Sequence, residues 1–177
     1  MIDPRQLVLH VIRPVLISLD LSSANAEKLL LGTACVEAEC GRYLVQIGGP
    51  ALGIYQMEKA THDDCWENYL NLLSNTLAHK VDRWCTIDPP DDLAPEMIGN
   101  LCYATAMARV KYLRDPAPIP DYLGGHAAYW KRVYNSPLGA GTVQGYLQAW
   151  NRFVSPTLSL ELWGTHDQTI KPDFIVA

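Results

Sequence analysis

The segment from residue 32 to residue 57 has the sequence GTACVEAECGRYLVQIGGPALGIYQM. Its first part is apolar with a helical spacing and holds Glu37 and Glu39 shortly before Gly41. Its second part has two short apolar stretches on either side of Gly48-Gly49-Pro50, where glycine and proline favour a turn. The segment therefore predicts a helix followed directly by a small β-hairpin, with strands at residues 43–47 and 52–56.

The rest of the chain has mostly helical patterning. Several of its helix starts carry residues that commonly cap a first turn. These candidates are Asp3 with Pro4, Ser22 or Ser23, Thr61 with Asp64, and Thr142. The composition of residues 87–95 indicates a loop. The first helix is expected at residues 4–19 with a bend at Pro14, and the second from Ser22 or Ser23 to Gly41. Further helices are expected from residue 61 towards 84 and at 97–112, 121–134 and 142–153.

Length and composition indicate the fold class. A chain of 177 residues in which 49% are hydrophobic fits one compact domain. We therefore expect residues 1–177 to form a single, mainly α domain with a small β-hairpin after the helix of Glu37. In residues 154–177, Leu158, Leu160 and Leu162 alternate with other residues. This alternation predicts an extended C-terminal tail that packs on the domain or docks on a neighbour's sheet edge.

The charge and the N-terminal sequence argue against several classes of protein. Lys and Arg total 14 against 19 Asp and Glu, and the net charge of −5 disfavours a nucleic-acid partner. The N-terminal apolar run has no basic leader and contains Arg13 and Pro14, so we expect neither a signal peptide nor membrane insertion. The chain is therefore expected to be soluble and not exported by the usual route.

Metals and cofactors are not expected. The five cysteines form no CxxC pair and leave one unpaired in any disulfide scheme, which favours reduced thiols. His62-Asp63-Asp64 resembles a metal-binding cluster, but the helix dipole alone favours acidic residues in a first helical turn. The glycine-rich pieces lack the flanking pattern of phosphate-binding loops, which argues against a nucleotide cofactor.

Glu37 is the candidate catalytic residue. Helical periodicity places it with Leu30, Thr33 and Ala34, whereas Glu39 lies about 200° away. Apolar surroundings and the negative end of the helix dipole both disfavour a charged carboxylate. A glutamate in such surroundings is able to keep a proton near neutral pH and to act as a general acid on a sugar, which is one hypothesis for Glu37. The simpler alternative is an exposed or salt-bridged glutamate at a helix end.

Several motifs resemble a known enzyme family. GTACVEAE followed by GGPALGIYQMEKAT, with Asn100-Leu101 leading into CYATAMARVKYL, is similar to the soluble lytic transglycosylases and goose-type lysozymes. The resemblance covers residues 25–152 and implies a lysozyme-like α+β domain in which Glu37 is catalytic. The family's final motif is split here, because AAYWKRVYNSPLG offers either Ala128-Tyr129 or Tyr134-Asn135. The residues expected to bind substrate are Tyr55, Gln56, Tyr103, Tyr129, Tyr134 and Asn135.

The resemblance implies cleavage of the β-1,4 bond between N-acetylmuramic acid and N-acetylglucosamine in peptidoglycan. In a lytic transglycosylase one glutamate protonates the glycosidic oxygen and then accepts a proton from the C6 hydroxyl, which closes a 1,6-anhydro ring. Residues 41–57 contain no Asp or Glu, whereas glycosidases that retain or invert configuration use a second carboxyl group. This absence favours transglycosylation. In the alternative, a muramidase-type hydrolysis, Glu58, Asp63 or Asp64 holds a water molecule.

The resemblance is closest in character to the lysozyme-like proteins that bacteriophages carry in their virions. It implies synthesis in the host cytoplasm, assembly with other virion or tail proteins, and action on peptidoglycan glycan strands in the periplasm or cell wall. A further hypothesis from another class is a virion structural or adaptor protein that keeps this fold without catalytic activity. The acidic charge, the split final motif and the expected tail favour that hypothesis.

Overall fold

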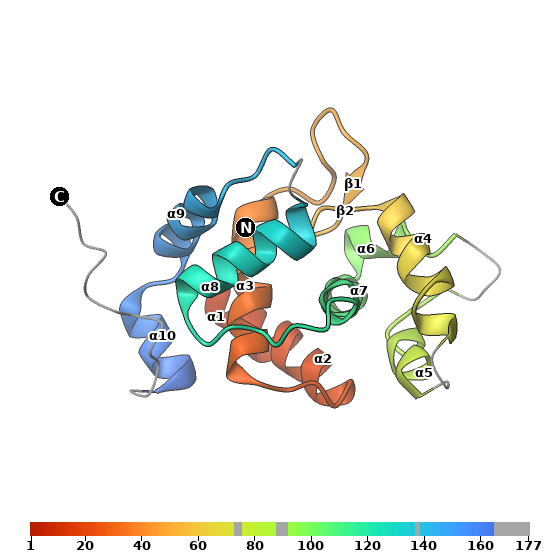
Figure 1. The fold of residues 1–177 in the computed structure, drawn as a ribbon, viewed down its shortest axis with the longest axis horizontal. Coiled ribbons are helices and arrows are strands. Elements are labelled where there is room, and N and C mark those ends of the chain that lie inside the picture. Colours follow the sequence, from red (N-terminus) through yellow and green to blue (C-terminus); the bar gives the residue numbers. More distant parts are fainter. Residues whose placement is uncertain (73–75, 88–91, 137–138, 165–177) are drawn as a thin grey trace.

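The computed structural model describes residues 1–72, 76–87, 92–136 and 139–164. In this part of the chain the protein is mainly helical with one two-stranded antiparallel hairpin, so the predicted fold class is confirmed. The central helix α3 (Ala24–Ala38) packs against α7 (Leu101–Leu113), α8 (Leu123–Tyr129) and α9 (Val143–Phe153) (Figure 1). None of the helices in the described ranges is long and apolar enough to cross a membrane.

The N-terminal helix is built from three successive segments, α1 (Pro4–Leu7), η1 (Val8–Ile12) and α2 (Arg13–Ser18). Asp3 caps it as predicted, because its side chain accepts a hydrogen bond from the backbone N–H of Gln6 at 3.1 Å. The middle segment is a π-helix that ends just before Pro14. Since proline has no N–H to donate within a helix, the wider π-helical turn lets the chain pass this residue without a break.

The helix α3 carries Glu37 in its last turn. Ser23 caps its start by accepting a hydrogen bond from the N–H of Ala26 at 3.1 Å. Most of its residues are buried around the whole circumference, as expected for a helix in the centre of a domain. The helix ends at Ala38 rather than at the predicted Gly41, because Glu39 already has a left-handed backbone with φ of 46°.

The hairpin lies later in the chain than predicted. Strand β1 (Ala51–Leu52) pairs with β2 (Met57–Glu58), and Ala51 lies opposite Glu58. The predicted first strand at residues 43–47 contributes one isolated bridge, between Val45 and Leu52. The positive φ values of Gly53, 72°, and Gln56, 45°, place a turn where the sequence predicts the second strand.

The helices between residues 59 and 135 also differ from the prediction at their ends. The helix α4 (Lys59–Glu67) begins before Thr61, so Thr61 is not its cap. The predicted helix 97–112 is divided into α6 (Glu96–Gly99) and α7 by Asn100, whose side chain accepts from the N–H of Tyr103 at 3.0 Å. The remaining described segments are η2 (Leu70–Leu72), α5 (Thr76–Asp82) and the π-helix η3 (Trp130–Asn135), which continues α8.

The predicted extended tail is wrong for its first part, which forms α10 (Pro156–Trp163). Ser155 caps this helix and Pro156 occupies its first turn, a combination that favours helix over strand. Trp163 donates a hydrogen bond through Nε1 to Glu27 of α3 at 2.8 Å, which fastens α10 to the domain. The rest of the predicted tail, residues 165–177, and its predicted docking lie outside the described residues.

Candidate active site

Glu37 is a partly buried carboxylate at the end of α3. Trp130, the first residue of η3, donates a hydrogen bond through Nε1 to Oε1 of Glu37 at 2.9 Å. Burial raises the pKa of Glu37 to about 7, although the Trp130 hydrogen bond and the charge of Lys111 both act to lower it. At this pKa the carboxyl group exists in both protonation states near neutral pH, so it is able to donate and to accept a proton.

Glu39 has the opposite environment at the same end of the helix. It forms ion pairs with Arg42 at 3.0 Å and with Arg152 at 3.3 Å. The hydrogen bond from Arg42 is the main reason why the pKa of Glu39 lies below its ordinary value. The two glutamates are therefore distinguished by their surroundings, and only Glu37 is suited to general acid catalysis near neutral pH.

Lys111 of α7 is the cation that most influences Glu37. Its Nζ donates to the backbone carbonyl of Tyr134 at 2.6 Å and lies 4.0 Å from the centroid of the Tyr134 ring. Burial lowers the pKa of Lys111, and the charge of Glu37 is the strongest influence in the opposite direction. Tyr134 in turn donates a hydrogen bond to the carbonyl of Tyr55 at 3.0 Å, which connects this cluster to the hairpin.

Trp130 is buried and closely packed against its neighbours. It is 1% exposed, and its ring centroid lies 5.5 Å from that of Tyr146. A Cβ added at Gly141 would lie 2.4 Å from Cη2 of Trp130 and 2.8 Å from Nδ2 of Asn135, so this glycine permits a close backbone approach. Asn135 therefore lies near the indole that binds Glu37, and its Oδ1 accepts from Nζ of Lys131 at 2.9 Å.

Gln56 is the other polar residue predicted to bind substrate. It is partly exposed in the turn between β1 and β2, and its Nε2 donates to the carbonyl of Gly53 at 2.8 Å. It directly follows Tyr55, whose carbonyl is bound by Tyr134. Both Gln56 and Asn135 thus keep part of their surface accessible, and their roles as substrate ligands stay predictions.

The four tyrosines predicted to bind substrate are core residues instead. Tyr55, Tyr103, Tyr129 and Tyr134 are 1%, 0%, 4% and 5% exposed. Each hydroxyl is hydrogen bonded within the protein: that of Tyr103 to His62 and Trp66, for example. The prediction failed because tyrosine has both an apolar ring and a polar tip, so its position in the sequence does not separate a cleft wall from a core.

The acidic residues after the hairpin are mostly engaged by cations. Asp63 forms an ion pair with Lys59 at 2.8 Å, and Asp64 forms one with Arg114. Glu58 lies on strand β2, and the side chain of Glu58 is exposed. Among the described residues, no group of three or more His, Cys, Asp and Glu side chains is arranged to hold a metal ion.

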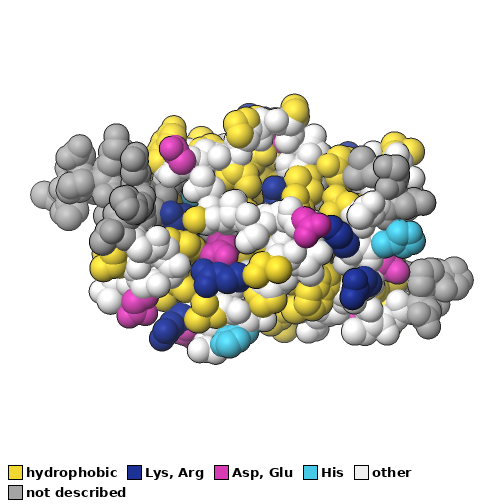
Figure 2. All heavy atoms as spheres, turned by 90° about the horizontal axis from the view of Figure 1, so that it is seen from below, with side chains coloured by type: hydrophobic (Ala, Val, Ile, Leu, Met, Phe, Trp, Pro, Cys, Tyr) yellow, Lys and Arg dark blue, Asp and Glu magenta, His cyan; other side chains and the backbone are white. Residues whose placement is uncertain are grey.

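Charged side chains of both signs share the face of the molecule that Figure 2 presents. Figure 2 shows basic and acidic side chains interspersed on the face that it presents. Lys59 also pairs with Asp92 at 2.9 Å, and Arg132 pairs with Asp115. The face in Figure 2 therefore offers no extensive basic patch of the kind that binds nucleic acid.

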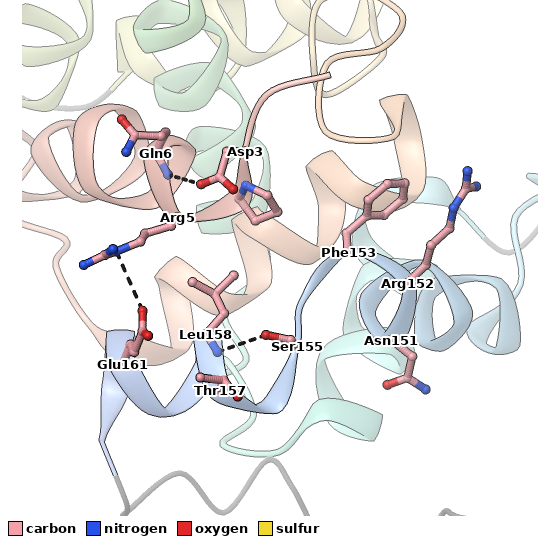
Figure 3. Close-up of a pocket in the computed structure, with 11 residues that line it drawn as sticks. Asp3, Arg5, Gln6, Asn151, Arg152, Phe153, Ser155, Thr157, Leu158 and Glu161 are labelled. Carbon is pink, nitrogen blue, oxygen red and sulfur yellow. Dashed lines mark hydrogen bonds and ion pairs between the residues drawn. The ribbon is translucent and has the colours of Figure 1, made fainter.

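Two surface hollows lie away from Glu37. The first, of about 510 Å³, lies between the N-terminal helix and the region from α9 to α10 (Figure 3). Its polar groups serve the fold: Asp3 and Ser155 cap helices, and Arg5 lies 3.8 Å from Glu161. The second, of about 650 Å³, is lined by residues of η1, α6 and α7 with Thr86 and Pro95. Glu37 lines neither hollow.

Sequence reasoning missed Trp130 and Lys111 as members of the site. Trp130 lies in the same AAYWKRVYN segment as the two predicted tyrosines, and an indole N–H is a donor that requires a partner when buried. Lys111 lies in the mostly apolar stretch CYATAMARVKYL, where a cation signals a nearby carboxylate or carbonyl. These two signals were present in the sequence, but neither identifies Glu37 as the partner.

No protein-family model, curated protein or solved structure matches the chain. The geometry around Glu37 and the motifs of the sequence are the features that bear on function. Both point to the same carboxyl group at the end of α3.

Proposed function

We propose that this protein is a peptidoglycan lytic transglycosylase that cleaves the β-1,4 bond between N-acetylmuramic acid and N-acetylglucosamine. The observation that carries the proposal is the state of Glu37. This carboxyl group is partly buried, has its pKa raised to about 7 and is held by Trp130. It occupies the position at which the resembling motifs have their catalytic glutamate.

Protonated Glu37 starts the reaction by donating its proton to the glycosidic oxygen. The bond between C1 of the muramic acid and this oxygen then breaks, and the N-acetylglucosamine part leaves. The carboxylate that forms is stabilised by the N–H of Trp130 and by the charge of Lys111. Both groups are already in place before the charge appears, so little reorganisation is required.

The carboxylate then acts as a base in the second step. It accepts the proton of the C6 hydroxyl while the C6 oxygen attacks C1, which forms the 1,6-anhydro ring and returns Glu37 to its protonated state. A pKa near the working pH suits a group that must be an acid in one step and a base in the next.

Transglycosylation is favoured over hydrolysis because it requires one carboxyl group. Of the three candidates for a second carboxylate, Asp63 and Asp64 are bound by Lys59 and Arg114. Glu58, the third, has an exposed side chain and is the residue that a muramidase-type mechanism would have to use. We therefore retain hydrolysis as the alternative reaction, with Glu58 as its test position.

The setting that we propose is a bacteriophage virion. The protein would be made in the host cytoplasm, assemble with other virion or tail proteins and cut glycan strands in the periplasm or cell wall. A net charge of −5 does not favour unaided approach to an anionic wall, so delivery by a larger particle suits this chain.

The test is product analysis on purified peptidoglycan. Wild type, Glu37→Gln, Glu39→Gln and Glu58→Gln are incubated with the substrate, and the released fragments are identified by mass. The proposal predicts anhydro-muropeptides from wild type, Glu39→Gln and Glu58→Gln, and none from Glu37→Gln. Reducing-end products that disappear in Glu58→Gln would establish hydrolysis instead. Absence of any product from folded wild type would favour the structural or adaptor protein.

A further inference from the structure

Two cysteines on either side of Glu37 meet in the core. Cys35 lies in the last turn of α3, Cys40 follows the end of that helix, and their Sγ atoms are 2.9 Å apart. Both are free thiols, exposed by 1% and 0%. The sulfur atoms of a disulfide are about 2.05 Å apart, so the two thiols lie within about 1 Å of bonding distance.

The backbone between the two cysteines is shaped to bring them together. The N–H of Cys40 donates to the carbonyl of Ala34 at 3.0 Å, which folds the chain back over the end of α3. Glu39 and Cys40 have backbone φ values of 46° and 52°, a left-handed conformation that residues other than glycine rarely adopt. A glycine would fit position 40 with less strain, whereas a cysteine there gains its contact with Cys35.

We propose that Cys35 and Cys40 form an intramolecular disulfide that closes the turn after Glu37 when the chain folds in the presence of a small disulfide such as oxidised glutathione. The expectation of reduced thiols would then hold for the other three cysteines only. This inference is independent of the proposed activity, because it concerns a covalent bond within the fold.

The reaction is two successive thiol–disulfide exchanges. The thiolate of one cysteine attacks a sulfur of oxidised glutathione, and one glutathione thiolate leaves. The thiolate of the second cysteine attacks the protein sulfur of this mixed disulfide, which forms the Cys35–Cys40 bond and releases the second glutathione. The protein loses two electrons and two protons, and one glutathione disulfide becomes two glutathione thiols.

Folding is the stage at which the bond is expected to form. Burial and the contact with Cys40 raise the pKa of the Cys35 thiol, so in the folded protein it is a weak nucleophile. Both sulfurs are also inaccessible to a reagent in the folded state. During folding the turn is still open, and both thiols are able to reach the oxidant.

Mass analysis of a single tryptic peptide detects this bond. Trypsin cuts after Lys28 and Arg42 and releases LLLGTACVEAECGR, which contains Cys35 and Cys40 and no other cysteine. The full-length protein is unfolded under reducing conditions, refolded in a buffer of reduced and oxidised glutathione, blocked with N-ethylmaleimide and digested. The proposal predicts that this peptide is lighter than its reduced form by two hydrogens and carries no maleimide.

Matched variants separate the bond from general oxidation. In Cys35→Ser and in Cys40→Ser the same peptide should carry maleimide or glutathione. Wild type refolded in reductant should melt about 5 °C below wild type refolded in the glutathione buffer, whereas each variant should melt at the same temperature after either treatment. In Cys85→Ser, as a control, the two-hydrogen loss should persist.

Two results would overturn the proposal. One is a protein with a native circular dichroism spectrum in which Cys35 and Cys40 each carry their own maleimide or glutathione. The other is a bond from either residue to another cysteine. If the chain does not refold, native protein is incubated with oxidised glutathione in urea up to its unfolding midpoint. The mass of the tryptic peptide with Cys35 and Cys40 is then measured as before, and the same outcomes support or overturn the proposal.

Discussion

Replacing Glu37 with Gln should stabilise the protein above neutral pH. The pKa of Glu37 rises from 4.5 to about 7 on folding, and one pKa unit corresponds to about 1.4 kcal/mol, so the ionised carboxylate destabilises the folded state by about 3 kcal/mol. Glutamine has nearly the same shape and keeps an oxygen for the Trp130 hydrogen bond at 2.9 Å. It carries no charge that burial would penalise.

The sign of the pH dependence follows from proton binding. Between pH 4.5 and about 7 the folded protein keeps the Glu37 proton that the unfolded chain has lost. The stability of wild type therefore falls through this window as the pH rises, and the difference from Glu37→Gln grows from near zero below pH 4.5 to about 3 kcal/mol at pH 8. For a chain of this length the variant should melt about 6–12 °C higher at pH 8.

Urea denaturation of both proteins between pH 4 and pH 8.5 measures this difference. Glu39→Gln is the matched control, since Glu39 lies at the same end of α3 but is held by Arg42 and Arg152. The Glu39→Gln substitution should not stabilise the protein at any pH. Parallel stability curves for wild type and Glu37→Gln across the whole range would refute the reasoning, because they would mean that Glu37 ionises in the folded state as it does in water.

Further predictions concern the groups around Glu37 and the hairpin. Lys111→Met should raise the pKa of Glu37, because it removes a cation that lowers it, and the alkaline limb of the activity profile should move to higher pH. Trp130→Phe should move the same limb in the same direction through loss of the hydrogen bond; an unchanged limb in both variants would argue against this electrostatic account. Gly53→Ala should lose at least about 2 kcal/mol in urea denaturation, because φ is 72° and the new Cβ would lie 2.3 Å from the carbonyl oxygen of Met97; a loss near zero would contradict this contact.

The fold class and the position of Glu37 were accessible from the sequence because both depend on local signals. Asp3, Ser23 and Thr142 cap helices as predicted, since a capping side chain acts on backbone groups within the same turn. Helical periodicity places Glu37 and Glu39 on different sides of the helix, and the motif resemblance selects Glu37; their pKa shifts have opposite directions.

Other features depend on contacts between distant segments. The hairpin register is set by the turn at Gly53 and Gln56, whose positive φ values a short apolar run does not reveal. The alternation of leucines after residue 157 predicts an extended segment, but Ser155 and Pro156 supply a helix start and the segment is helical. The partnership of Trp130 with Glu37 joins two segments that are distant in sequence, and no local pattern encodes it.

The protonation state of Glu37 is the central requirement of the proposed mechanism, and it is directly measurable. The side-chain carboxyl carbon is labelled with ¹³C, assigned by its absence in Glu37→Gln, and followed by NMR from pH 4 to pH 9. The account predicts a midpoint at about 7. A midpoint near the ordinary glutamate value of 4.5 would contradict it, because the group would then hold no proton to donate at neutral pH.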